Sequence, residues 1–159
     1  MNAVDALPPA LERSLDGSDL RDKVGETFLL CTAGVEGWPH VAMLSVGELI
    51  ATSARELRMA LHAGSSTSAN LERTGRGTLL AVLDGRAVTV RVRAATLDVR
   101  RVAGLELRFF SARVAELIEH KVGYAELESG VRFRLTEVDG TLRRWEQTLA
   151  ALRGSGTCV

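Results

Sequence analysis

The stretch ELRMALHAGSSTSANL, residues 56–71, changes its character at Gly64. Before this glycine, the apolar run from Leu57 to Leu61 predicts a strand. After it, four hydroxyl side chains open a segment with helical spacing. The first N–H groups of a helix are unpaired and carry the positive end of its dipole, so hydroxyls gathered there can hold a phosphate or another anion. Serine and threonine are also the ordinary capping residues, and a simple cap is the commoner meaning of such a run.

Outward from this stretch, short apolar runs alternate with turn signals such as Gly34 to Gly37 and Asp84-Gly85. With the strand at 57–61, the sequence predicts about eight strands, the others at 27–32, 38–44, 47–51, 78–83, 88–93, 105–118 and 131–135. The connections are of hairpin type, and a single helix is long enough to cross a sheet. These features favour a mainly β (α+β) class, a small antiparallel barrel with peripheral helices, over a parallel doubly wound sheet.

Two local patterns place features on this barrel. Pro39 cannot donate a ladder hydrogen bond, so its strand is expected at an edge. The apolar positions change phase between Phe109 and Phe110, which predicts one extra residue there, a β-bulge at a barrel corner.

Arginines alternate with apolar residues on two of the predicted strands. They are Arg91, Arg93, Arg132 and Arg134. A basic patch across neighbouring strands is one interpretation, and a solvated face opposite the core is the favoured one.

The chain has no low-complexity linker and no internal repeat, which predicts a single domain over residues 1–159. The barrel is expected at about 24–138, after an N-terminal helical segment at 8–24 and before a C-terminal helix at about 141–153. One apolar stripe lines that last helix: Leu142, Trp145, Leu149 and Leu152. The stripe packs either on its own barrel or on a partner, and both interpretations are structural.

Composition narrows the class of function. Twenty basic and twenty acidic side chains cancel, and aromatic residues make up 4% of the chain, so we expect neither nucleic-acid nor membrane binding. Cys31 and Cys158 make no disulfide framework, and the three histidines lie far apart, so we expect a reducing cytoplasm and no metal site. No run approaches the length of a membrane span.

The order of these motifs resembles the pyridoxamine 5'-phosphate oxidase-like, FMN-binding split-barrel family. The resemblance covers roughly residues 24–135 and rests on Gly37-Trp38-Pro39-His40-Val41, the strand ending at His62, the Gly64-Ser65 turn, Asn70-Leu71 and Gly75-Arg76. It implies an antiparallel Greek-key split β-barrel, FMN as cofactor, and a homodimer with the ligand site between the barrels.

Carried over to this chain, the resemblance implies a strand backbone facing the flavin ring at Met43, Leu44 and Ser45. It implies phosphate contacts at Ser65, Ser66, Thr67 and Asn70. A hydrogen bond from Ser45 to the flavin edge is one further hypothesis, and His62 is a candidate donor to the phosphate or a surface group at a strand end.

The chain departs from the oxidases where they carry charged or phosphate-binding side chains. It has Ala42 in place of an arginine, Leu61 in place of a threonine, Ser66-Thr67 in place of Arg-Lys, and Gly47 in place of the substrate-contacting lysine. Charge-assisted contacts are about twice as strong as neutral ones, so the grip on FMN should be weaker. Arg58 or an arginine of a partner subunit can replace the lost cations; otherwise the site is lost.

Three functions follow from these features. The first is a flavin-dependent oxidoreductase of unknown substrate, in which the cofactor performs the chemistry. The second is a non-enzymatic binder or sensor of flavin, deazaflavin or haem. The third is a ligand-free interaction protein on the same fold.

Overall fold

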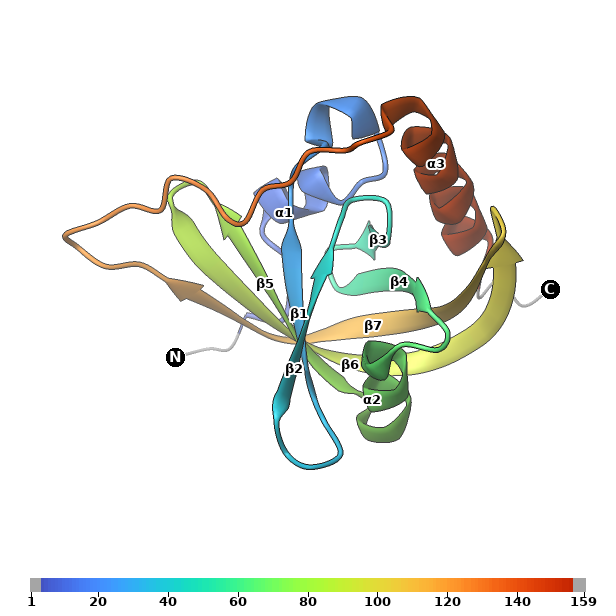
Figure 1. Cartoon of the computed structure of the whole chain (residues 1–159). Helices are drawn as coiled ribbons and strands as arrows, with labels where there is room; N and C mark the ends of the chain where they lie inside the picture. Colours follow the sequence, from blue (N-terminus) through green and yellow to red (C-terminus); the bar gives the residue numbers. More distant parts are fainter. Residues whose placement is uncertain (1–3, 156–159) are drawn as a thin grey trace.

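The computed structural model describes residues 4–155. The strands are β1 (Phe28–Ala33), β2 (Pro39–Leu44), β3 (Leu49–Ser53), β4 (Glu56–His62), β5 (Arg76–Leu83), β6 (Arg86–Val102) and β7 (Leu105–His120). The helices are α1 (Pro9–Ser14), the 3-10 turn η1 (Leu20–Lys23), α2 (Ser66–Thr74) and α3 (Val138–Gly154). The fold is mainly β with helices at its periphery, as the hairpin spacing predicts (Figure 1).

One antiparallel sheet contains all seven strands, in the order β2-β1-β5-β6-β7-β4-β3. At its centre is the long β6–β7 hairpin, whose strands have 17 and 16 residues. β5 pairs with the first half of β6, whereas β4 pairs with the first half of β7, so the two flanking sets of strands are joined to opposite halves of the hairpin. The curled sheet is a split barrel (Figure 1). β2, which begins at Pro39, is an edge strand as expected.

A bulge lies at Phe109-Phe110, but its extra residue is on the facing strand and not on β7, where the change of phase predicted it. The β6–β7 register shifts there, because Thr96 faces Phe110 and Asp98 faces Phe109. The extra residue, Leu97, is on β6, the strand that faces the two phenylalanines. Both rings are fully buried.

The strand predicted at 131–135 is wrong, so the sheet has seven strands and not eight. Residues 121–137 run irregularly along the outside of the barrel from β7 to α3 (Figure 1). Within the described chain, the bridge between Arg132 and Glu26 and a hydrogen bond of 2.8 Å from the Leu127 N–H to the Gly85 carbonyl join the backbone of this segment to the rest. Phe133 packs its ring edge-on against Trp145, with 6.4 Å between centroids. The apolar alternation therefore reflects anchoring of side chains on the core and not strand pairing.

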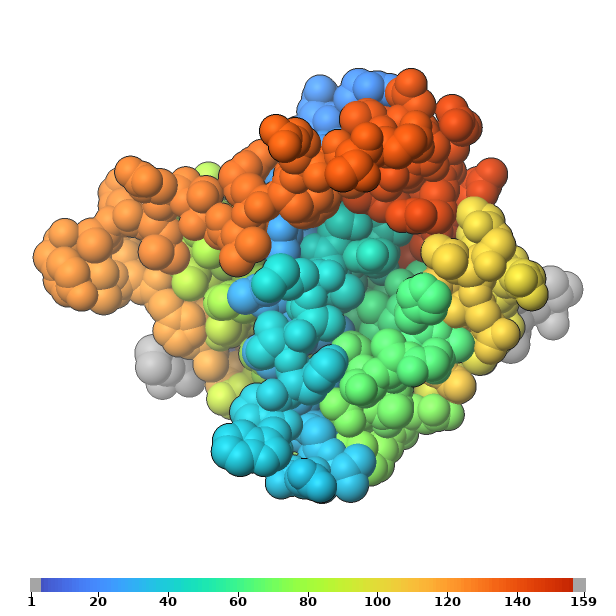
Figure 2. Space-filling model, viewed as in Figure 1, coloured from blue at the N-terminus to red at the C-terminus, as the bar shows by residue number. Residues whose placement is uncertain are grey.

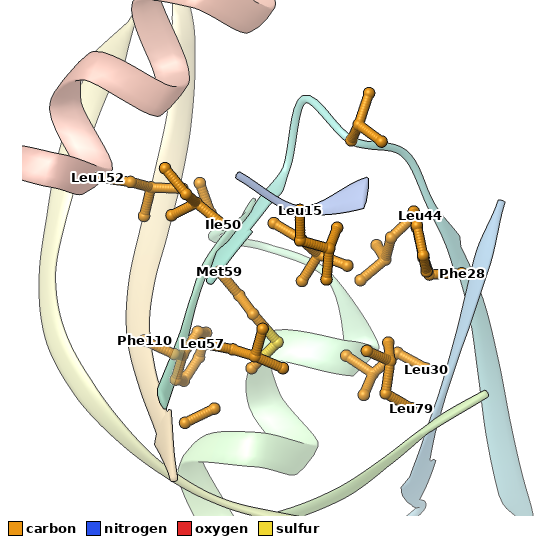
Figure 3. Packing of buried hydrophobic residues seen from close by; sticks show 14 of the residues in the cluster. Leu15, Phe28, Leu30, Leu44, Ile50, Leu57, Met59, Leu79, Phe110 and Leu152 are labelled. Atoms are coloured by element: carbon orange, nitrogen blue, oxygen red, sulfur yellow. The ribbon is translucent and has the colours of Figure 1, made fainter. Parts of the chain in front are cut away.

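The interior of the barrel is filled by side chains from both flanking sets of strands. Leu30 and Leu79 meet Met59 and Phe110 across it, and Leu15 closes the end near α1 (Figure 3). Fully burying a side chain of this size stabilises a fold by about 1.5–3 kcal/mol. Because the interior is occupied, a ligand must bind outside the barrel core.

Helix α3 packs its apolar stripe on its own barrel, which decides between the two interpretations of that stripe. Leu142, Trp145, Leu149 and Leu152 are all buried, and the helix contacts β3, β4 and β6. The closest fit is at Gly47, where the indole ring of Trp145 occupies the space that a Cβ atom would need.

The C-terminal end of α3 is held by Arg58 of β4. The guanidinium donates to the carbonyl oxygen of Leu152 at 2.9 Å and also to the carbonyl of Ser155. The last carbonyls of a helix have no intrahelical partner, so this arginine supplies the hydrogen bonds that they lack.

We predict that Gly47→Ala destabilises the protein by about 1–3 kcal/mol, because the added methyl group overlaps the Trp145 ring and forces α3 outward. Thermal unfolding measures the loss. Gly123→Ala is the matched control, since a Cβ atom there meets nothing within 4 Å. An unchanged melting temperature for Gly47→Ala would show that α3 is not seated on this glycine.

Candidate functional site

A cavity of about 380 Å³ lies where the end of β2, the end of β4 and the start of α2 meet α3. In Figure 2 the corresponding segments, cyan and green, meet below α3, drawn in red. The walls combine apolar and polar side chains: Ala42, Leu44, Glu48, Leu61, His62, Ser65, Thr67, Leu105, Leu107, Arg144, Trp145 and Thr148. Its size and composition are those of a site for a small molecule.

The start of α2 forms the polar end of this cavity. Ser65 caps the helix, with its hydroxyl oxygen accepting from the Ser68 N–H at 3.1 Å, and the Ser68 hydroxyl donates to the His62 carbonyl at 2.6 Å. Thr67 is buried and lines the cavity, whereas Ser66 is exposed and does not. The first-turn N–H groups that the cap leaves unpaired give this end a positive potential.

Of the three residues predicted to face the flavin ring, one lines the cavity. Leu44 lines the cavity. Met43 points to the other face of β2, where 65% of the residue is exposed. Ser45 lies behind the cavity wall, where it binds Glu48.

Glu48 is the residue that sequence reasoning missed. It sits in a tight turn after β2, and the Ser45 N–H donates to its Oε2 at 2.6 Å while the Ser45 hydroxyl donates at 3.2 Å. Burial raises the pKa of this carboxyl group, and the bonds from Ser45 and the charges of Arg144 and His62 oppose that rise. The cavity therefore holds a carboxyl group that a proton or a ligand's donor group can satisfy.

α3 supplies the wall that the sequence assigned to packing alone. Trp145 presents its ring to the cavity, and Arg144 and Thr148 add a cation and a hydroxyl on either side of it. The spacing of 144, 145 and 148 places them on one helix face. Only the docking of α3 brings this face to β2 and β4, so no local signal in the sequence marks these residues as site residues.

Two predicted site residues are engaged elsewhere. Arg58 caps the end of α3 and so is not the cation at the Ser65 turn. Asn70 is buried between α2 and β1, where its Nδ2 donates to the Thr32 hydroxyl at 3.1 Å and its Oδ1 accepts from Arg73. Neither residue lines the cavity.

The arrangement suits a planar ligand that carries an anionic group. Leu44, Leu107 and Trp145 offer apolar surface to a ring system. The α2 N-terminus and Arg144 offer positive potential to an anion.

Within residues 4–155 no group of three or more His, Cys, Asp or Glu side chains is placed to hold a metal ion. No helix of this part of the chain is both long and apolar enough to span a bilayer.

The chain is 40% identical over 153 residues to the protein YclD of Bacillus subtilis (strain 168), which is itself uncharacterised. The match covers 96% of this chain and 99% of that protein. No protein-family model matches the chain.

Solved structures share the fold at low sequence identity. A candidate pyridoxamine 5'-phosphate oxidase from Lactobacillus delbrueckii matches with a TM-score of 0.55 and 14% identity, over 72% of this chain and 95% of that one. An F420 reductase matches with a TM-score of 0.52 and 12% identity, over 70% and 98%. HupZ from Group A Streptococcus has a TM-score of 0.52 and 11% identity, over 73% and 97%. The split-barrel fold implied by the resemblance is confirmed.

The raised pKa of Glu48 leads to a prediction about stability. A carboxyl group with a raised pKa binds its proton more tightly in the folded state, so the free energy of unfolding falls as pH rises above its ordinary pKa of 4.5. The glutamine of Glu48→Gln cannot ionise. The free energy of unfolding of this variant, compared with that of the wild type, should therefore rise when the pH is raised from about 4 to about 8. Urea unfolding at both pH values measures the difference.

The matched control is Glu146→Gln, which removes an exposed carboxylate from α3. It should follow the wild type at both pH values. A difference between Glu48→Gln and the wild type that does not change with pH would contradict the assignment of a buried, raised-pKa carboxyl group.

Proposed function

The chain belongs to the same family as Bacillus subtilis YclD and has the split-barrel fold of the pyridoxamine 5'-phosphate oxidase-like proteins, and we propose that it is an FMN-binding oxidoreductase. The cofactor site is the cavity below α3. The observation that carries this proposal is the combination, in one cavity, of an apolar wall closed by Trp145 with the capped N-terminus of α2.

The polar end of the cavity fits the phosphate of FMN. Ser65 orients the first turn of α2, and the buried Thr67 offers a hydroxyl beside the first-turn N–H groups. Arg144 supplies a cation from α3 in place of those that this chain lacks at Ala42, Ser66 and Thr67. Helix N-termini and arginines commonly bind phosphate, and their presence in one cavity supports this assignment.

FMN, when bound, supplies hydride and electron transfer that no side chain can perform. The chain's own contribution is to hold the ring, exclude water and place a proton-binding group. Trp145 and Leu107 contribute buried apolar surface to the cavity wall. Glu48 holds a proton at the cavity wall at higher pH than an exposed carboxyl would, and Ser45 orients it. The contacts of Ser45 thus favour a positioning role over a direct bond to the flavin edge.

We predict that FMN binds the purified protein saturably and more tightly than riboflavin, which lacks the phosphate. Arg144→Gln should weaken FMN binding by about tenfold, the usual loss for one hydrogen bond to a charged group, and leave riboflavin binding nearly unchanged. Quenching of flavin fluorescence measures both affinities.

Arg143→Gln is the control, because Arg143 is exposed on the same helix and does not line the cavity. Equal affinities for FMN and riboflavin, or equal losses in the two variants, would contradict phosphate binding at this site. A deazaflavin is the second ligand to test, since an F420 reductase shares the fold.

A further inference from the structure

Three arginines stand side by side on the outer face of the sheet. Arg76 of β5 is in register with Arg93 of β6, which is in register with Arg113 of β7. Register partners point to the same face, with Cβ atoms about 5 Å apart. All three residues are exposed. We call them the arginine row.

The arginine row lacks the cross-strand pairing of arginine with glutamate that is found elsewhere on these strands. Elsewhere on the β6–β7 hairpin an arginine meets a glutamate, as in Arg86–Glu119 at 3.0 Å and Arg91–Glu116 at 2.7 Å. In the part of the chain that the structure describes, no carboxylate forms an ion pair with a member of the row. Like charges directly opposite one another destabilise a sheet. A bound anion would remove this repulsion.

Ordinary structural roles account for little of the row. Arg76 follows the C-terminal end of α2, where a positive charge is favourable. Arg93 and Arg113 lie within strands and gain nothing from a helix end. Glu56 of β4 is in register with Arg113, but its carboxylate binds Thr52 and Arg58. The burial of the preceding or following residue on each strand explains why these arginines face outward, and not why they lie opposite one another.

A groove of about 860 Å³ runs over this face. Arg76 and Arg93 line it together with the hydroxyl side chains of Thr74 and Thr78. The carboxylate of Glu116 also lines the groove, where Arg91 pairs with it at 2.7 Å. Arg113 is not part of the lining and lies beside it, in register with Arg93. Its volume is that of a small-molecule site. The net charge of the chain is zero and aromatic residues are few, so the attraction is local and no stacking surface for nucleic acid accompanies it.

We propose that this groove binds a small molecule with a diphosphate group, whose oxygens Arg76 and Arg93 hold from within the groove and Arg113 holds from beside it. Guanidinium groups bind phosphate oxygens in pairs, and three of them exceed what one phosphate needs. The several negative charges of a diphosphate match the three positive charges of the row.

The groove is distinct from the cavity below α3. Among the described residues, no side chain lines both. The cavity contains the first residues of α2 and the groove contains its last residue, so the two sites lie at opposite ends of a nine-residue helix, about 13 Å long. The proposal therefore does not depend on FMN binding.

Calorimetric titration of the full chain with inorganic pyrophosphate, at constant ionic strength, tests the proposal. The wild type should bind saturably, and Arg93→Gln should weaken binding by at least about tenfold. Arg113→Gln should do the same. Arg101→Gln, which removes an exposed arginine from β6 outside the row, should retain binding within about twofold of the wild type.

Several outcomes would overturn the proposal. The wild type could fail to bind pyrophosphate, or Arg93→Gln and Arg101→Gln could lose affinity equally. Tighter binding of a single-stranded RNA than of pyrophosphate, lost in Arg93→Gln, would assign the row to nucleic acid. A change of mass in sedimentation for Arg93→Gln alone would assign it to a contact between copies.

FMN affinity is the control for the fold of Arg93→Gln. If this variant binds FMN as the wild type does, its loss of pyrophosphate binding is confined to the groove.

Discussion

The packing of Trp145 on Gly47 is the contact on which the candidate cofactor site depends. Because Gly47 has no side chain, the indole ring of Trp145 packs directly on the backbone after β2. This contact sets the distance between α3 and the barrel. Arg58 holds the far end of the helix through its last carbonyls, and an exposed ion pair of 2.9 Å between Arg21 and Asp139 joins its first turn to η1. With α3 in this position, an open edge of the barrel becomes a partly enclosed cavity.

The wall that α3 adds accounts for the partial burial of a carboxyl group in this cavity. Burial of Glu48 costs free energy that an aliphatic residue would avoid, and two hydrogen bonds from Ser45 offset only part of it. Proteins keep such groups mainly where a ligand or a proton uses them. Glu48 and the arginine row are alike in this respect, because each is a charged group that the fold leaves incompletely compensated.

Local signals predicted the parts of the fold that local chemistry decides. The Gly64-Ser65 turn and the α2 cap follow from residues within one helical turn, and the edge position of β2 follows from Pro39. The alternation of apolar residues at 131–135 led to a wrong prediction. A segment that buries every second side chain, such as Phe133, shows this alternation whether or not its backbone pairs with a strand.

The candidate site was less predictable, because its walls come from distant parts of the chain. Arg144 and Thr148 reach the cavity only through the docking of α3, and nothing in the sequence around Glu48 shows that it is buried. Arg58 is on the strand that leads to the α2 turn, yet it donates to the carbonyl of Leu152 in α3, 94 residues away. These assignments need the tertiary structure.

A crystal structure of the chain grown with FMN tests the central claim, that α3 forms one wall of a flavin site, most directly. We expect the flavin in the cavity, with its phosphate at Ser65 and Thr67 and its ring beside Trp145. Flavin bound elsewhere, such as in the groove over the arginine row with no contact to α3, would contradict it.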